Sequence, residues 1–186
     1  MKNTLWSKFC DQQNFYAAWQ KVRANMGAAG TDKVTITDFE ANLDQNLDLL
    51  LQTVLGGSYQ PLPYLIFKRK KESGTFRELK IPAVRDRIVQ EAILLQIQPI
   101  FEKMFLDCSY AYRPRKSALK AVDRVERNIK RGKEWVFDAD IEKFFDNIVH
   151  EILFHALQKK MEDTKLFGLI ERIIKIEPSE QCIGIA

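Results

Sequence analysis

Two aspartates, Asp138 and Asp140, stand at the end of a short apolar run in the second half of the chain. The run is rich in residues that favour β-structure, so the segment 134–140 is predicted to be a short strand. A carboxylate at the end of a buried strand must be paired or bind a cation. Hard oxygen ligands suit Mg²⁺, and two such ions can support phosphoryl transfer. The alternative is that both aspartates are surface residues on an edge strand.

A basic hairpin supplies a second group of candidate residues. The segments 62–70 and 76–81 are rich in β-formers, and Gly74 lies in the turn between them. Lys71 and Arg77 flank this turn on facing strands. Two cations at such a place can clamp a triphosphate, and the planar fork of arginine suits phosphate oxygens. The alternative is a solvated hairpin whose lysines protect the edge of a sheet.

Helical periodicity predicts most of the elements that must position these residues. Apolar residues recur at spacings of three and four in several segments, which we expect to be helices: about 12–25, 35–55, 84–105, 117–131, 149–159 and 165–176. Pro99 is expected to bend or interrupt the helix that contains it. Together with the hairpin, this pattern predicts a helix-rich α+β fold.

The segment around Asp140 also carries a family resemblance. Residues 136–150 resemble motif A of reverse transcriptases, in the form found in the group II intron and CRISPR-associated branch. In that motif a metal-binding aspartate is followed five residues later by an aromatic residue that excludes a 2′-hydroxyl. Asp140 has Phe145 at this offset, whereas Asp138 has a lysine there. The resemblance implies that Asp140 is the catalytic metal ligand, that Ile141 adds its backbone carbonyl, and that Phe145 lies under the sugar of the incoming dNTP.

Three further segments resemble blocks of the same family in the same order. Residues 25–32 resemble the extension block Asn-x-Gly-x-x-Gly-x-Asp, 71–77 the fingertip block Lys-x-x-Gly-x-x-Arg, and 109–118 the block Ser-Tyr-Gly-Phe-Arg-Pro-x-x-Ser-Ala. The implied triphosphate contacts are Lys71 and Arg77. The implied nucleic-acid contacts are Gly27, Gly30, Arg113, Arg115 and Lys116. For the arginines, pairing with acids inside the protein is an equal alternative.

The resemblance implies polymerase fingers followed by the first part of a right-hand palm. We expect an N-terminal helix and extension loop at 1–33, fingers at 34–132 with the hairpin at 62–82, and a partial palm at 133–186. The family also needs a Tyr-x-Asp-Asp motif and a Gln-Gly block, which this sequence lacks. Its strand-like end, 182–186, resembles the lead-in to the second of these. We therefore expect the full-length parent to polymerise DNA and the 186-residue piece not to.

The composition is that of a globular cytoplasmic protein without a membrane partner. The chain is 46% hydrophobic and 29% charged, has a net charge of +4, and carries three widely separated cysteines. The resemblance implies an RNA template, a DNA primer and dNTP as partners, and two Mg²⁺ ions, or Mn²⁺, as cofactors. An intron maturase that binds intron RNA and a CRISPR-associated enzyme that works with an integrase and copies RNA into spacers both remain open. So does a non-catalytic RNA-binding module.

Overall fold

A computed structural model describes residues 4–70, 74, 76–145, 147–176 and 178–184. The chain divides into two compact units, which are described separately. The first contains residues 1–97 and 157–186, and the second contains residues 98–156. In the part of the chain that is described, no helix has both the length and the apolar character needed to cross a bilayer.

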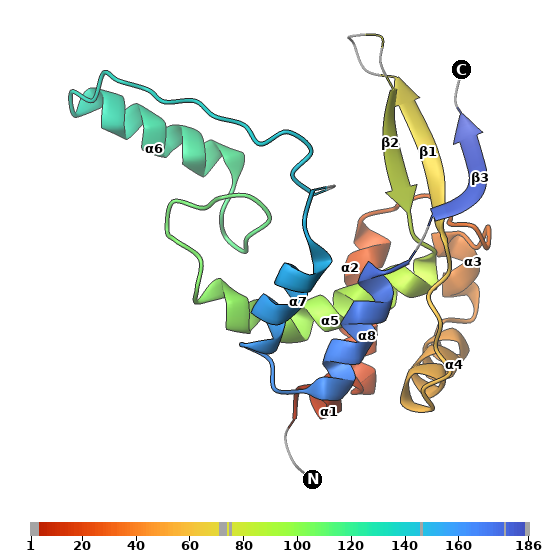
Figure 1. The fold of residues 1–186 in the computed structure, drawn as a ribbon. Coiled ribbons are helices and arrows are strands. Elements are labelled where there is room, and N and C mark those ends of the chain that lie inside the picture. Colours follow the sequence, from red (N-terminus) through yellow and green to blue (C-terminus); the bar gives the residue numbers. More distant parts are fainter. Residues whose placement is uncertain (1–3, 71–73, 75, 146, 177, 185–186) are drawn as a thin grey trace. The chain divides into compact units, whose positions relative to one another are not determined.

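Most helices belong to the first unit, where local capping explains several of their ends. The Asp11 side chain accepts a hydrogen bond from the Gln13 amide at the start of the second helix, and Thr35 forms a reciprocal capping box with Asp38 at the third. The helices are α1 (Leu5–Phe9), α2 (Gln12–Ala24), α3 (Ile36–Ala41), α4 (Leu43–Leu55), α5 (Val84–Glu102) and α8 (Thr164–Ile174), labelled in Figure 1. Only the last turn of α5 lies in the second unit.

The core of the first unit forms where α1, α2, α5 and α8 bring large apolar side chains together. Each helix contributes fully or almost fully buried residues: Phe9, Phe15, Trp19, Ile88, Leu166 and Leu169. Burying one such side chain contributes about 1.5–3 kcal/mol to folding. The buried Asn14 side chain joins α2 to α5 by donating to the Ala92 carbonyl at 3.1 Å. This core provides the platform from which the hairpin extends.

The hairpin is part of a three-stranded sheet with the order β2-β1-β3. Strand β1 (Tyr64–Lys70) pairs antiparallel with β2 (Phe76–Ile81), and β3 (Pro178–Gly184) runs parallel to β1 on its other side (Figure 1). A segment from the far end of the sequence therefore completes the sheet. Strand β1 is central, and β2 lies at an edge.

The second unit contains α6 (Ala118–Lys130) and most of α7 (His150–Gln158). Ser117 caps α6 by accepting a hydrogen bond from the Lys120 amide. No residue of α6 is buried, although one face of the helix is apolar. That face consists of Leu119, Val122, Val125 and Ile129, all exposed.

The α+β class and the predicted helices are confirmed, with two differences. The expected helix at 35–55 is two helices, because the backbone leaves helical geometry at Asn42, whose φ is −132° and ψ is 51°. The short helix α1 was not predicted, since five residues are too few to show a helical period. Pro99 lies inside α5 without ending it. The expected functional boundaries after residues 33 and 132 remain predictions.

The prediction of a strand at 134–140 is wrong. These residues have no regular secondary structure, and their apolar side chains are open to solvent, with Trp135 98% and Phe137 91% exposed. A strand needs a hydrogen-bonded neighbour, and a buried one needs a sheet to pack against. The three strands in the described part of the chain pair only with one another, so 134–140 has no such neighbour there.

Candidate nucleotide- and nucleic-acid-binding residues

Asp140 lies in the second unit, in the segment 134–140 that has no regular secondary structure, and it is exposed. It therefore does not lie at the end of a buried strand, as the sequence had predicted. Ile141, the next residue, is also exposed. Both offer hard oxygen donors, a carboxylate and a backbone carbonyl, which is the chemistry that Mg²⁺ prefers. Among residues 4–70, 74, 76–145, 147–176 and 178–184, however, no group of three or more acidic, histidine or cysteine side chains could hold a metal. The donor set in this part of the chain fits the ion in type but is incomplete.

Phe145 follows in a turn that the backbone closes tightly. Lys143 adopts a positive φ of 49°, and the Asn147 side chain donates to the Glu142 carbonyl at 3.1 Å. The ring of Phe145 is 75% exposed and packs edge-to-face against Phe144, with the ring centroids 5.2 Å apart. An exposed aromatic face of this kind is available to stack on a sugar or base.

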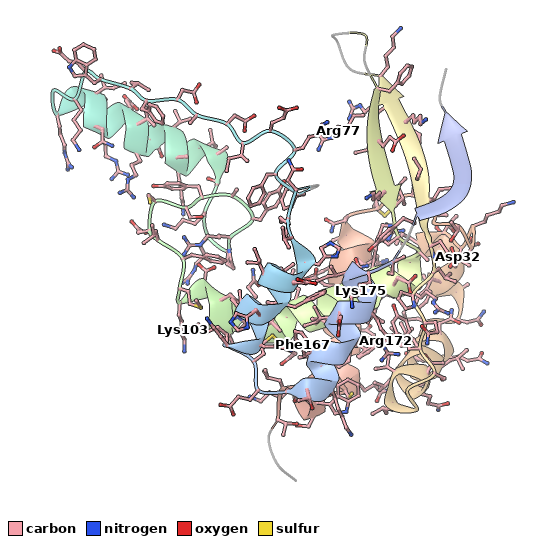
Figure 2. All side chains as sticks on the ribbon, viewed as in Figure 1. Asp32, Arg77, Lys103, Phe167, Arg172 and Lys175 are labelled. Atoms are coloured by element: carbon pink, nitrogen blue, oxygen red, sulfur yellow. The ribbon has the colours of Figure 1, made fainter. Side chains whose placement is uncertain are left out.

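Arg77 lies on β2, where its exposed side chain is labelled in Figure 2. The strand register places Arg69 of β1 directly opposite it. Lys71, the other predicted triphosphate contact, lies outside the described residues. The sequence predicted a basic hairpin. The structure adds that the cross-strand partner of Arg77 is a second arginine, Arg69.

Arg113 has protein partners for most of its guanidinium. Its side chain is only 9% exposed, pairs with Glu102 at 2.8 Å, and donates to the carbonyls of Leu106 and Ser109. The hydrogen bond from Arg113 lowers the pKa of the Glu102 carboxyl. For Arg113, the structure therefore shows the alternative in which the arginine pairs with an acid of the protein, Glu102. Its contact with a template remains a prediction.

The other two basic residues of this block differ from each other. Lys116 donates to the Asp107 carboxylate at 2.6 Å and is largely covered. Arg115 is exposed and has a positive φ of 62°. Within the described ranges its guanidinium makes no hydrogen bond or ion pair. Arg115 is thus the member of the set whose charge is most available to a phosphate.

Gly27 and Gly30 have a role inside the protein. A Cβ atom at Gly30 would lie 2.5 Å from the Ala83 Cα, and one at Gly27 would lie 2.2 Å from a guanidinium nitrogen of Arg87. Arg87 also donates to the carbonyl of Ala28. Gly30 therefore allows the extension loop to lie directly on the backbone before α5, while Gly27 leaves space for the Arg87 guanidinium. Contact between this loop and a template remains a prediction.

Sequence reasoning missed a buried polar cluster at the base of the hairpin. Asp86, in the first turn of α5, accepts hydrogen bonds from the Tyr59 hydroxyl at 2.7 Å and the Leu62 amide at 2.9 Å. Arg85 approaches the same carboxylate at 3.3 Å. Burial, followed by the charge of Asp86, raises the pKa of Tyr59 well above its ordinary value. The sequence does show that Asp86 lies in the first turn of a predicted helix. It does not show which hydrogen-bond donors pack against that carboxylate.

Large parts of this chain are similar in sequence to known proteins. Residues 68–183 match the family described as reverse transcriptase (RNA-dependent DNA polymerase). The chain is 36% identical over 151 residues to Protein YkfC of Escherichia coli (78% of this chain and 39% of that protein) and 30% identical over 162 residues to the group II intron-encoded protein LtrA of Lactococcus lactis (87% and 27%). It is also 30% identical over 98 residues to the nuclear intron maturase 1 of Arabidopsis thaliana (53% and 14%). The chain spans 39% or less of these three relatives. Because the family match covers more than half of its residues, the chain belongs to the reverse transcriptase family.

Proposed function

We propose that the full-length protein is an RNA-directed DNA polymerase of the group II intron type. The family match supports this because it spans both Arg77 and Asp140, the two positions that the sequence predicts for nucleotide and metal binding. The names of the relatives favour the intron branch over the CRISPR-associated one, since they include an intron-encoded protein and an intron maturase. Intron RNA is accordingly a further proposed partner, beside the RNA template and DNA primer.

In this proposal, Asp140 and the Ile141 carbonyl provide part of the site for two Mg²⁺ ions, which Mn²⁺ could replace. When bound, such ions activate the primer hydroxyl and stabilise the leaving pyrophosphate. Asp140 is exposed, so its carboxylate is accessible to such ions. The remaining ligands would be the second aspartate pair that the family requires.

The hairpin and the turn at Phe145 serve the incoming dNTP in this proposal. Lys71 and Arg77 hold the triphosphate, with the arginine donating in pairs to phosphate oxygens. Phe145 lies beneath the sugar, where an aromatic ring leaves no space for a 2′-hydroxyl. Arg113, Arg115, Lys116 and the loop with Gly27 and Gly30 are the proposed nucleic-acid contacts, of which Arg115 has the most available charge. We place the protein in the cytoplasm.

Primer extension by the full-length protein, with Mg²⁺ and an RNA template, tests the proposal. Asp140→Asn should abolish extension, because an amide is a poor substitute for a metal-binding carboxylate. The matched control is Asp138→Asn, which makes the same change two residues away and should retain most activity. Phe145→Ala should increase incorporation of ribonucleotides relative to deoxynucleotides.

Two results would overturn this assignment. Undiminished extension by Asp140→Asn would remove Asp140 from the active site. Absence of extension by the unaltered protein, together with RNA binding that Asp140→Asn leaves unchanged, would instead identify a non-catalytic RNA-binding module. RNA binding should weaken as salt is added, because phosphate contacts release counterions.

A further inference from the structure

Two arginines face each other across the hairpin near its turn. Arg69 of β1 and Arg77 of β2 are direct cross-strand partners in the antiparallel ladder. Residues opposite each other in such a ladder share a face of the sheet, with Cβ atoms about 4.5–5.5 Å apart. Like charges in this position are destabilising. The Arg69–Arg77 pair is therefore one that the stability of the hairpin alone would disfavour.

The charges on the opposite face of the hairpin are arranged differently. There Lys68 lies opposite Glu78 and forms an ion pair with it at 3.4 Å, while Lys70 faces an apolar partner. Both Arg69 and Arg77 are exposed. In the described part of the chain, which omits residues 71–73 and 75, no carboxylate forms an ion pair with either arginine. Two neighbouring guanidinium groups thus project from one face without a counter-charge in that part of the protein.

The pairing of β1 with β2 fixes the backbone of Arg69. The described pairing of β1 with β3 ends one residue earlier, at Lys68 opposite Gly184. Arg69 itself pairs with Arg77 in the antiparallel ladder with β2. The strand register therefore holds the two arginines side by side.

We propose that Arg69 binds the nucleotide triphosphate together with Arg77. The inference rests on the proposed polymerase function and adds a residue that the fingertip motif does not contain. Each guanidinium has five N–H donors and no acceptor, so the pair can grip several oxygens of adjacent phosphates at once. The bound polyanion also removes the repulsion between the arginines. The fixed strand register holds both groups ready, which lowers the entropy lost on binding.

Binding of inorganic tripolyphosphate to this chain tests the proposal directly. The experiment compares the unaltered chain with Arg69→Gln, Arg77→Gln, the double variant and Lys80→Gln, using calorimetry at low salt. Lys80→Gln is the matched control, since it removes one exposed positive charge from β2 on the opposite face of the hairpin. Backbone amide spectra of each variant establish that the hairpin remains folded.

Each single arginine variant should weaken binding about tenfold, and Lys80→Gln by less than about twofold. The double variant should bind only slightly worse than either single variant, because both arginines hold the same ligand. Without tripolyphosphate, Arg69→Gln should unfold at the same or a higher denaturant concentration than the unaltered chain, since the repulsion is gone.

The proposal is overturned if Arg69→Gln binds tripolyphosphate as Lys80→Gln does, or if the unaltered chain does not bind it. Single-stranded RNA is the second probe: loss of RNA affinity with unchanged tripolyphosphate affinity would assign Arg69 to the template and also overturn the proposal. Failure of the polymerase function is distinguishable. It would appear as absent primer extension by the full-length protein, while the triphosphate site still required both arginines.

Discussion

The hydroxyl of Tyr59 donates a 2.7 Å hydrogen bond to Oδ1 of Asp86, and both side chains are almost completely buried, at 2% and 1% exposure. Oδ2 of the same carboxylate accepts from the Leu62 amide. One acid at the start of α5 thus holds the segment before β1 at two points, Tyr59 and Leu62. Because β1 and β2 carry the two facing arginines, this carboxylate positions the base of the proposed triphosphate site.

Asp86→Asn should destabilise the first unit by about 1–3 kcal/mol. An amide has a single acceptor oxygen, so it cannot accept from both Tyr59 and Leu62 in the present geometry. Urea unfolding followed by tryptophan fluorescence would measure the loss. Tyr59→Phe removes only one of these hydrogen bonds and should cost less. A variant as stable as the unaltered chain would show that the carboxylate does not tie the hairpin to α5.

Gly30→Ala should destabilise the same unit by about 1–3 kcal/mol, because the new Cβ would lie 2.5 Å from backbone atoms of Ala83. Backbone cannot move aside as a flexible side chain can. Gly168→Ala is the control, since a Cβ there meets no atom within 4 Å and the residue is in the middle of α8. Alanine should leave stability unchanged or increase it at that position. Equal effects of the two substitutions in thermal unfolding would contradict this reading.

Acid should loosen the loop between α5 and α6. The hydrogen bond from Arg113 lowers the pKa of Glu102 from its ordinary 4.5. A carboxyl with a lowered folded-state pKa stabilises the fold above its unfolded pKa, and this stabilisation disappears as the pH falls through the folded value. The protection of the Arg113 Nε proton against exchange, relative to an exposed arginine at the same pH, should therefore fall below about pH 4.5.

Two variants separate the groups that titrate in this range. The pKa of Asp107 is also lowered, chiefly by its hydrogen bond from Lys116, so its contribution disappears on the acid side as well. Glu102→Gln should lower the protection of Arg113 Nε and remove most of its pH dependence, whereas Asp107→Asn should leave that dependence largely intact. If Asp107→Asn alone abolished the dependence, the Glu102–Arg113 pair would not be its source.

Cys10 and Cys108 should differ in reactivity. Burial, reinforced by the charge of Asp163, raises the pKa of Cys10 to about 11, while Cys108 is exposed. Only thiolate is alkylated at an appreciable rate, so Cys10 should react much more slowly with iodoacetamide near pH 8. Mass spectrometry of peptides would give both rates. In urea the two rates should converge, and similar rates in the folded chain would rule out a protected Cys10.

The helices were the part of the fold that could be predicted from sequence. Periods such as Phe15, Trp19 and Val22 are local, and helix hydrogen bonds join residues only four apart, so no distant partner has to be known. The turn at Gly74 made the hairpin equally visible. The strand predicted at 134–140 failed for the opposite reason. An apolar run shows that a segment can form a strand, but pairing depends on a neighbour elsewhere in the chain.

Sequence alone also established the family, because Asp140, Phe145 and the fingertip block occur in the expected order, and family recognition needs only order and spacing. Tertiary structure decided which groups meet. It placed Arg69 opposite Arg77, paired Arg113 with Glu102, and brought β3 beside β1. These contacts join residues through strand register, loop closure and the packing of distant segments. A local pattern does not encode such long-range geometry, since many registers and partners are compatible with the same run of residues.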